Sequence, residues 1–150
     1  DLPLSRGLGD VYKRQENDSA NDGLEYELKT KVFEDSRVND DVEICSLESN
    51  WEGYDILSWL DRSKKKPLCI EVKSSIKPLD QAKAYISKNQ WIMAENLNDG
   101  FMFYFWSQRK LARLSVNNLK DHVPRDMNSG AWEKFNVPMS IFSEYFFEVN

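Results

Sequence analysis

Six consecutive apolar residues, from Phe101 to Trp106, constrain the fold of this chain more than any other part of its sequence. A strand with one face in water alternates apolar and polar residues, whereas a strand covered on both faces is apolar throughout. The run is far shorter than the roughly 20 apolar residues that a membrane-spanning helix needs. We therefore predict a central strand at 101–106, in a sheet that has further layers packed on both faces.

Hydrophobic spacing and capping residues predict the elements around this strand. Leu24, Leu28 and Val32 recur at intervals of four and predict a helix with these residues on its apolar face. Ser87 and Gln90 have the spacing of a capping box at the start of a second helix. In chain order we expect a helix over 23–35, strands over 42–47, 54–60 and 68–74, the second helix, the central strand and more sheet over 111–116. This order, α-β-β-β-α-β, indicates an α/β fold with a mixed central sheet flanked by helices, followed by a tail of loops and short turns.

The length and charge of the chain indicate a single domain without a broad basic surface. Its 150 residues suit one compact domain, which we place at 16–150. Residues 1–15, DLPLSRGLGDVYKRQ, resemble translated sequencing-adapter sequence, and we interpret them as a non-native segment. The net charge of −5 argues against a broad basic surface, so any contact with DNA must be local, as at Lys64, Lys65 and Lys66. Because no apolar signal segment or membrane-spanning stretch is present, we expect a cytoplasmic location.

Cysteine and histidine point to structure rather than to metal chemistry. Cys45 and Cys69 lie in predicted strands without ligand spacing, so we expect free, buried thiols. His122 is the single histidine and lies in a loop-like stretch, where we expect a surface position.

The third predicted strand carries an acid and an amine on one face. Side chains alternate along a strand, so Glu71 and Lys73 point to the same side, while their apolar neighbours point to the other. The turn before this strand decides whether an acid of the second strand joins them. With Leu60 opposite Lys66, Asp55 falls opposite Glu71, with Cβ atoms about 4.5–5.5 Å apart. An even-numbered loop would instead separate the two acids.

Two opposed carboxylates suit magnesium, which prefers oxygen ligands and usually takes one or two carboxylates from a protein. The metal would neutralise a phosphate oxygen and lower the pKa of a bound water. Lys73 would hold that nucleophile or stabilise charge in the transition state. The alternative is a salt-bridged polar patch at the end of the sheet, because Glu-x-Lys alone is a weak signal. The chain has a second copy, Glu27 to Lys29, in the first predicted helix.

Two segments resemble a known nuclease family. Residues 52–58, EGYDILS, and residues 70–74, IEVKS, are similar to the restriction-endonuclease-like domain at the carboxy end of plant NO VEIN proteins. This domain also occurs in bacterial restriction and phage-defence proteins, and it is one branch of the PD-(D/E)xK nuclease superfamily. Residues 85–91 and Ala94 resemble the strand, cap and helix that often follow.

The resemblance implies roles for the motif residues. Asp55 and Glu71 become metal ligands, the backbone carbonyl of Val72 a further ligand, and Lys73 the catalytic amine.

Two further positions rest on looser similarity. Glu25 is similar to the helix acid that assists the metal site in many superfamily members. Gln90 departs from the Glu more usual in this branch, and we place it with the 64–66 lysines among the candidates for contact with nucleic acid.

We therefore expect a magnesium-dependent endonuclease that hydrolyses phosphodiester bonds in DNA, in restriction or phage defence. One alternative is a non-catalytic module on the same fold that binds nucleic acid or a helicase or ATPase partner. Another is an enzyme of this fold that acts on RNA or on a nucleotide-like substrate. The negative net charge favours the module, whereas the intact Asp55, Glu71 and Lys73 favour the enzyme.

Overall fold

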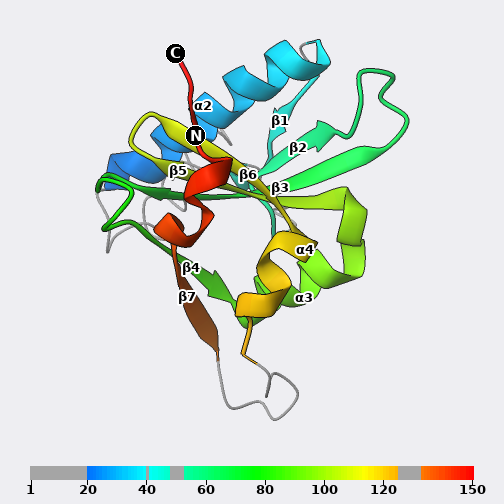
Figure 1. The fold of residues 1–150 in the computed structure, drawn as a ribbon. Helices are drawn as coiled ribbons and strands as arrows, with labels where there is room; N and C mark the ends of the chain where they lie inside the picture. The colour runs from blue at the N-terminus through cyan, green and yellow to red at the C-terminus, as the bar shows by residue number, and fades with distance from the viewer. Residues whose placement is uncertain (1–19, 40, 48–52, 125–132) are drawn as a thin grey trace.

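A mixed β-sheet organises the molecule, with β5 (Phe101–Ser107) near its centre (Figure 1). The structure is a computed structural model that describes residues 20–39, 41–47, 53–124 and 133–150. Within these residues the sheet has six strands in the order β1-β2-β3-β5-β6-β8, of which β3 and β5 are parallel and the other neighbours antiparallel. The remaining strands are β1 (Glu43–Ile44), β2 (Ile56–Trp59), β3 (Pro67–Ser75), β6 (Lys110–Ser115) and β8 (Phe147–Glu148).

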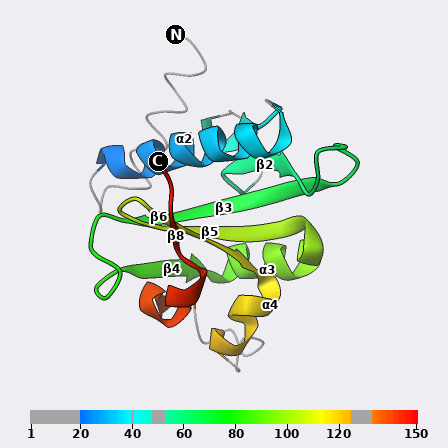
Figure 2. The ribbon, with the colours of Figure 1, turned by 45° about the horizontal axis from the view of Figure 1, so that its top comes forward.

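Two layers cover the sheet (Figure 2). Helix α2 (Ala20–Val38) packs on one face. The other face is covered by helices and by a second, two-stranded antiparallel sheet of β4 (Lys83–Ser87) and β7 (Lys134–Pro138), which we call the β4–β7 ribbon. The helical elements outside α2 are η1 (Cys45–Leu47), α3 (Lys88–Leu97), η2 (Asn98–Gly100), α4 (Val116–Leu119), η3 (Lys120–His122) and η5 (Met139–Tyr145).

The central strand is confirmed, and both its faces are buried. Phe101, Phe103 and Phe105 pack with the layer of α3 and the ribbon, whereas Tyr104 and Trp106 pack with the α2 layer. All five side chains are at most 1% exposed. The unbroken apolar run thus fills two separate cores with alternate residues.

Helix α2 is confirmed, but its predicted apolar face is wrong. Leu28 is 47% and Val32 68% exposed, whereas Tyr26, Thr30 and Glu34 are buried. The helix therefore packs by a face that carries polar groups. This orientation is stable because the buried polar groups find hydrogen-bond partners, as Thr30 does by accepting from the Trp106 indole at 2.8 Å.

Glu34 is the centre of this polar contact. Its carboxylate accepts hydrogen bonds from the Ser58 hydroxyl (2.6 Å), the Tyr104 hydroxyl (2.6 Å) and the Arg37 guanidinium (2.7 Å), and Arg113 donates in turn to the Tyr104 oxygen (2.8 Å). Burial by itself would raise the pKa of Glu34, but these hydrogen bonds and the Arg37 charge outweigh it and hold that pKa below its ordinary value. Burial and the neighbouring Glu34 raise the pKa of Tyr104 above its ordinary range. The network joins α2 to β2, β5 and β6.

The structure confirms some of the remaining predicted elements and corrects others. The capping box at Ser87 and Gln90 is confirmed, and both cysteines are free and buried. The strand expected over 42–47 is wrong beyond Ile44, where the chain turns into η1. The order predicted from hydropathy lacks β4, although the resemblance implied a strand before the Ser87 cap. The tail expected to be loops contains the strands β7 and β8. Hydropathy did not predict either ribbon strand, because each buries just two side chains, which alternate with exposed or half-buried ones.

Residues 1–15, which we interpret as a non-native segment, lie outside the described residues. Among the described helices, none is long and apolar enough to cross a membrane.

Candidate active site

Strand β3 divides its side chains between the two layers as predicted. Ile70 and Val72 pack in the α2 core, whereas Cys69 packs in the core on the other side. Glu71 and Lys73 contact α3, on the same side as Cys69. Apolar neighbours thus anchor the acid and the amine from the opposite face.

Of the two hairpin registers that the sequence left open, the structure has the one with Leu60 opposite Lys66. Leu60 N–H donates to the Lys66 carbonyl at 2.9 Å, and Ile56 pairs with Ile70. The expected pairing of Asp55 directly opposite Glu71 is wrong, because the ladder stops at Ile56. Asp55 N–H donates instead to the Ile70 carbonyl at 2.9 Å, which draws Asp55 out of the ladder.

Asp55 nevertheless reaches the motif on β3. Its Oδ2 accepts a 2.8 Å hydrogen bond from the N–H of Val72, the residue between Glu71 and Lys73. The side chain therefore takes the place next to β3 that a further residue of β2 would occupy. In the described part of the chain, β3 beyond Ile70 pairs with β5 but no longer with β2, so the site lies where the sheet gains an open edge.

Gln90, in the first turn of α3, joins Glu71 to Lys73. Its amide nitrogen donates to Glu71 Oε2 at 3.0 Å, and its amide oxygen accepts from Lys73 Nζ at 2.9 Å. The same oxygen accepts from the Ser87 N–H as part of the capping box. Lys73 Nζ also lies 3.4 Å from Glu71 Oε2. The cap of α3 thus fixes the geometry of the acid and the amine.

The carboxylates of this cluster are well shielded from water. Asp55 and Glu71 are each 2% exposed, and the Lys73 side chain is 17% exposed. Lys73 is therefore the member of the cluster that a large substrate reaches first.

The donor set fits magnesium. Asp55, Glu71 and the carbonyl of Val72 are hard oxygen donors, and magnesium usually takes one or two carboxylates from a protein. Each carboxylate has about four lone-pair positions, so a hydrogen bond at one oxygen is compatible with binding a cation. Among the described residues no three His, Cys, Asp or Glu side chains gather into a metal site, so any metal here relies on the pair.

The structure does not bring Glu25 to this cluster. Its side chain is 55% exposed and lies 3.4 Å from Lys29 on the outer surface of α2. Besides Glu34, α2 buries a second acid, Glu27, which is 2% exposed and accepts a hydrogen bond from the Ser46 hydroxyl. Ser46 N–H donates in turn to the Asp55 carbonyl at 3.4 Å. The signal that could have found Glu27 is its helical spacing from Thr30 and Glu34, which share the buried face.

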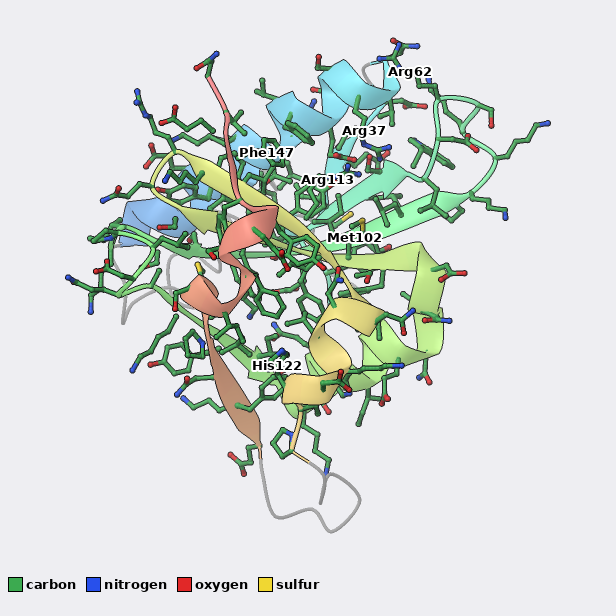
Figure 3. The ribbon with its side chains drawn as sticks, viewed as in Figure 1. Arg37, Arg62, Met102, Arg113, His122 and Phe147 are labelled. Atoms are coloured by element: carbon green, nitrogen blue, oxygen red, sulfur yellow. The ribbon has the colours of Figure 1, made fainter. Side chains whose placement is uncertain are left out.

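The lysines at 64–66 lie in the β2–β3 hairpin loop, away from the cluster. Lys66 precedes Glu71 by five residues, about 17 Å along an extended strand. Lys65 and Lys66 are exposed, whereas Lys64 Nζ lies 3.3 Å from the Asp41 carboxylate. Figure 3 labels Arg62 at this hairpin and His122 on the far side of the sheet, where the histidine ring packs 5.3 Å from Phe142. His122 is exposed, as expected.

Comparisons with known proteins identify the family and the fold. The family model described as "Protein NO VEIN, C-terminal" matches residues 20–111, more than half of the chain. Glu52, which the resemblance included, falls within this match but outside the described residues. No curated protein matches the chain.

Among solved structures, the chain is similar to Hjc from Archaeoglobus fulgidus, described as a Holliday junction resolvase from an archaeal hyperthermophile. The TM-score is 0.54 at 13% identity, covering 84% of this chain and 90% of that chain. At this identity the likeness shows the fold, which is that of the restriction endonucleases. The chain belongs to the NO VEIN C-terminal family and has a restriction-endonuclease-like fold.

Proposed function

We propose that the chain is a magnesium-dependent nuclease that hydrolyses phosphodiester bonds in DNA. The observation that carries this proposal is the convergence of two buried acids and an amine on three consecutive residues of β3. Glu71 and Lys73 are joined through Gln90, and Asp55 binds the peptide N–H between them. A purely structural salt bridge does not require the second buried acid.

The residues have separate roles in this reaction. Asp55, Glu71 and the Val72 carbonyl would hold the ion, which when bound neutralises phosphate charge and lowers the pKa of a bound water. Lys73 places a positive charge beside the scissile phosphate and stabilises the charge that develops on its oxygens. Gln90 keeps Lys73 and Glu71 in place before substrate arrives, so no reorganisation is needed during the reaction.

We also propose Glu27, in place of Glu25, as the helix acid that supports the site. Glu27 is buried and connects through Ser46 to the backbone of Asp55, whereas Glu25 is exposed and paired with Lys29. Glu27 acts by positioning: it holds the η1 segment, whose N–H groups bind the Asp55 carbonyl.

DNA as substrate is supported by the family and by the resolvase with the same fold. We place the activity in restriction or phage defence, where members of this family occur, with a helicase or ATPase subunit or fused domain as the expected partner. The exposed Lys65 and Lys66 of the hairpin and the Gln90 edge of the site are the local contacts proposed for DNA.

Incubation of the purified protein with plasmid DNA and magnesium tests this proposal. Asp55→Ala, Glu71→Gln and Lys73→Ala should each lower the rate by about 100-fold or more, because each removes charge stabilisation of the transition state. Lys29→Ala is the matched control on the outer surface of α2 and should leave the rate unchanged. A rate that Asp55→Ala does not alter would refute the assignment.

The net charge of −5 favours one rival, a non-catalytic module that binds nucleic acid or protein. A magnesium titration of the free protein, followed by thermal melting, separates the two. Binding of the ion to the folded state raises Tm, and Asp55→Ala should remove that rise in the enzyme. A module should show no such coupling. RNA substrates in the same assay distinguish a ribonuclease.

A further inference from the structure

The outer face of the β4–β7 ribbon is a basic and aromatic surface in an acidic protein. The inner face packs Ala84, Ile86, Phe135 and Val137 into the core. The described outer face has no acidic side chain, although the whole chain has a net charge of −5. Its side chains are Lys83, Tyr85, Ser87, Lys134, Asn136 and Pro138.

Tyr85 lies in the middle of this outer face. Its side chain is 52% exposed, and it pairs across the ribbon with Asn136. Lys134 Nζ lies 5.7 Å from the centre of the Tyr85 ring, within the range of a cation–π contact. Lys83 precedes Tyr85 by two residues and points to the same side. An exposed ring is thus flanked along the ribbon by two ammonium groups.

The ribbon is continuous with the candidate active site. Ser87 is the last residue of β4, on the same outer face as Tyr85, and its hydroxyl caps α3 by accepting from the Gln90 N–H at 3.1 Å. Gln90 in turn binds Lys73 and Glu71. Tyr85 lies two residues before this cap, about 7 Å along the strand. The ring thus lies one strand repeat from the cap that positions Gln90.

We propose that the outer face of the β4–β7 ribbon binds an unpaired stretch of the DNA strand that the candidate site cuts. A base stacks on the Tyr85 ring, and Lys83 and Lys134 contact the flanking phosphates. Stacking on an exposed ring requires a base free of its neighbours, which duplex DNA does not offer, so the platform selects unpaired DNA near the cut. That the bound strand is also the strand that is cut rests on the proposed nuclease function. The contact of single-stranded DNA with the ribbon does not depend on that function.

Binding of a fluorescent oligothymidylate and of a duplex of equal length, measured by anisotropy in EDTA, tests the platform. Tyr85→Ala should weaken binding of the single strand by about fivefold or more, as loss of one stacked base predicts, while Tyr85→Phe retains the wild-type affinity. Lys134→Ala should lower the salt slope of single-strand binding by about 0.7. Tyr145→Ala and Lys120→Ala are matched controls on another part of the surface and should leave both quantities unchanged.

Melting temperatures confirm that each variant is folded. Equal affinity of wild type and Tyr85→Ala for the single strand would overturn the platform, as would a loss confined to the duplex. Because EDTA prevents hydrolysis, the contact is measured apart from catalysis. A protein that binds through Tyr85 without cutting DNA would refute the nuclease and keep the platform. If the protein cuts DNA but Tyr85→Ala does not weaken binding, the nuclease proposal stands and the platform is refuted.

Discussion

The two ends of the Gln90 amide differ chemically, and the site uses both. The nitrogen donates to Glu71 and the oxygen accepts from Lys73, a combination that no carboxylate can supply. The Glu more usual in this branch would accept from Lys73 but place a second negative charge beside Glu71. Gln90 therefore orients both the acid and the amine without adding a charge.

The acids of α2 provide a residue-level prediction, because two of them differ in environment within one helical turn. Glu27→Gln should lower magnesium-dependent cleavage by about 10-fold to 100-fold, the usual effect of losing a group that positions a metal ligand. The affinity of the Glu27→Gln variant for magnesium, read from the metal-induced rise in Tm, should fall together with the cleavage rate. Glu25→Gln, an identical change on an exposed side chain, should alter neither. Equal effects of the two changes would remove Glu27 from the site.

Helix α3 links stability to the site through its first turn. Its cap, Ser87, accepts from the Gln90 N–H, and α4 has the same kind of cap in Ser115 and Asn118. The two capping boxes are chemically alike, but just one of them includes a residue that contacts the catalytic candidates. Capping thus stabilises both helices, while in α3 it also positions a side chain.

Ser87→Ala and Ser115→Ala form a matched pair that separates these effects. Each should lower the free energy of unfolding by about 1 kcal/mol, the usual cost of losing a serine cap. Ser87→Ala should in addition reduce cleavage, because the first turn of α3 then holds Gln90 less firmly. The measurements are denaturant unfolding and initial rates at the same temperature. If both variants lost activity in proportion to stability, the positioning role of the cap would be excluded.

At the level of the whole molecule, the Glu34 network ties the α2 layer to the sheet. It connects α2 with β2 through Ser58, with β5 through Tyr104, and with β6 through Arg113. Arg37 also donates to the carbonyls of Trp59 and Leu60, at the end of β2 where the hairpin loop begins. The layer that carries Glu27 is therefore held in place by buried ionic contacts in addition to apolar packing.

This network predicts a specific dependence of stability on pH. The pKa of Glu34 is lowered by folding, so the unfolded chain binds the proton more tightly and stability falls as the pH decreases below about 4.3. Glu34→Gln should flatten that part of the stability curve. Glu34→Ala should cost about 3–5 kcal/mol at neutral pH, because it leaves Arg37 half-buried without its carboxylate. Urea unfolding across the acid range measures both, with Glu25→Gln as the exposed control.

The sequence alone determined the features that depend on local periodicity. The apolar run 101–106 predicted a doubly covered strand, alternation on β3 placed Glu71 with Lys73, and the Ser87–Gln90 spacing predicted the start of α3. These follow from strand and helix geometry over a few residues. The hairpin register depends on the loop length, which the sequence left open and the structure resolved in favour of Leu60 opposite Lys66.

Tertiary structure decided which of two possible faces or partners each residue used. It turned Glu27 inward and left Leu28 and Val32 exposed, because buried polar groups on α2 found partners on strands far away in sequence. It started β2 at Ile56, one residue after Asp55, so that the acid binds the Val72 N–H instead of facing Glu71. It also paired β4 with β7. Such choices depend on contacts between distant segments, and no spacing within one segment determines them.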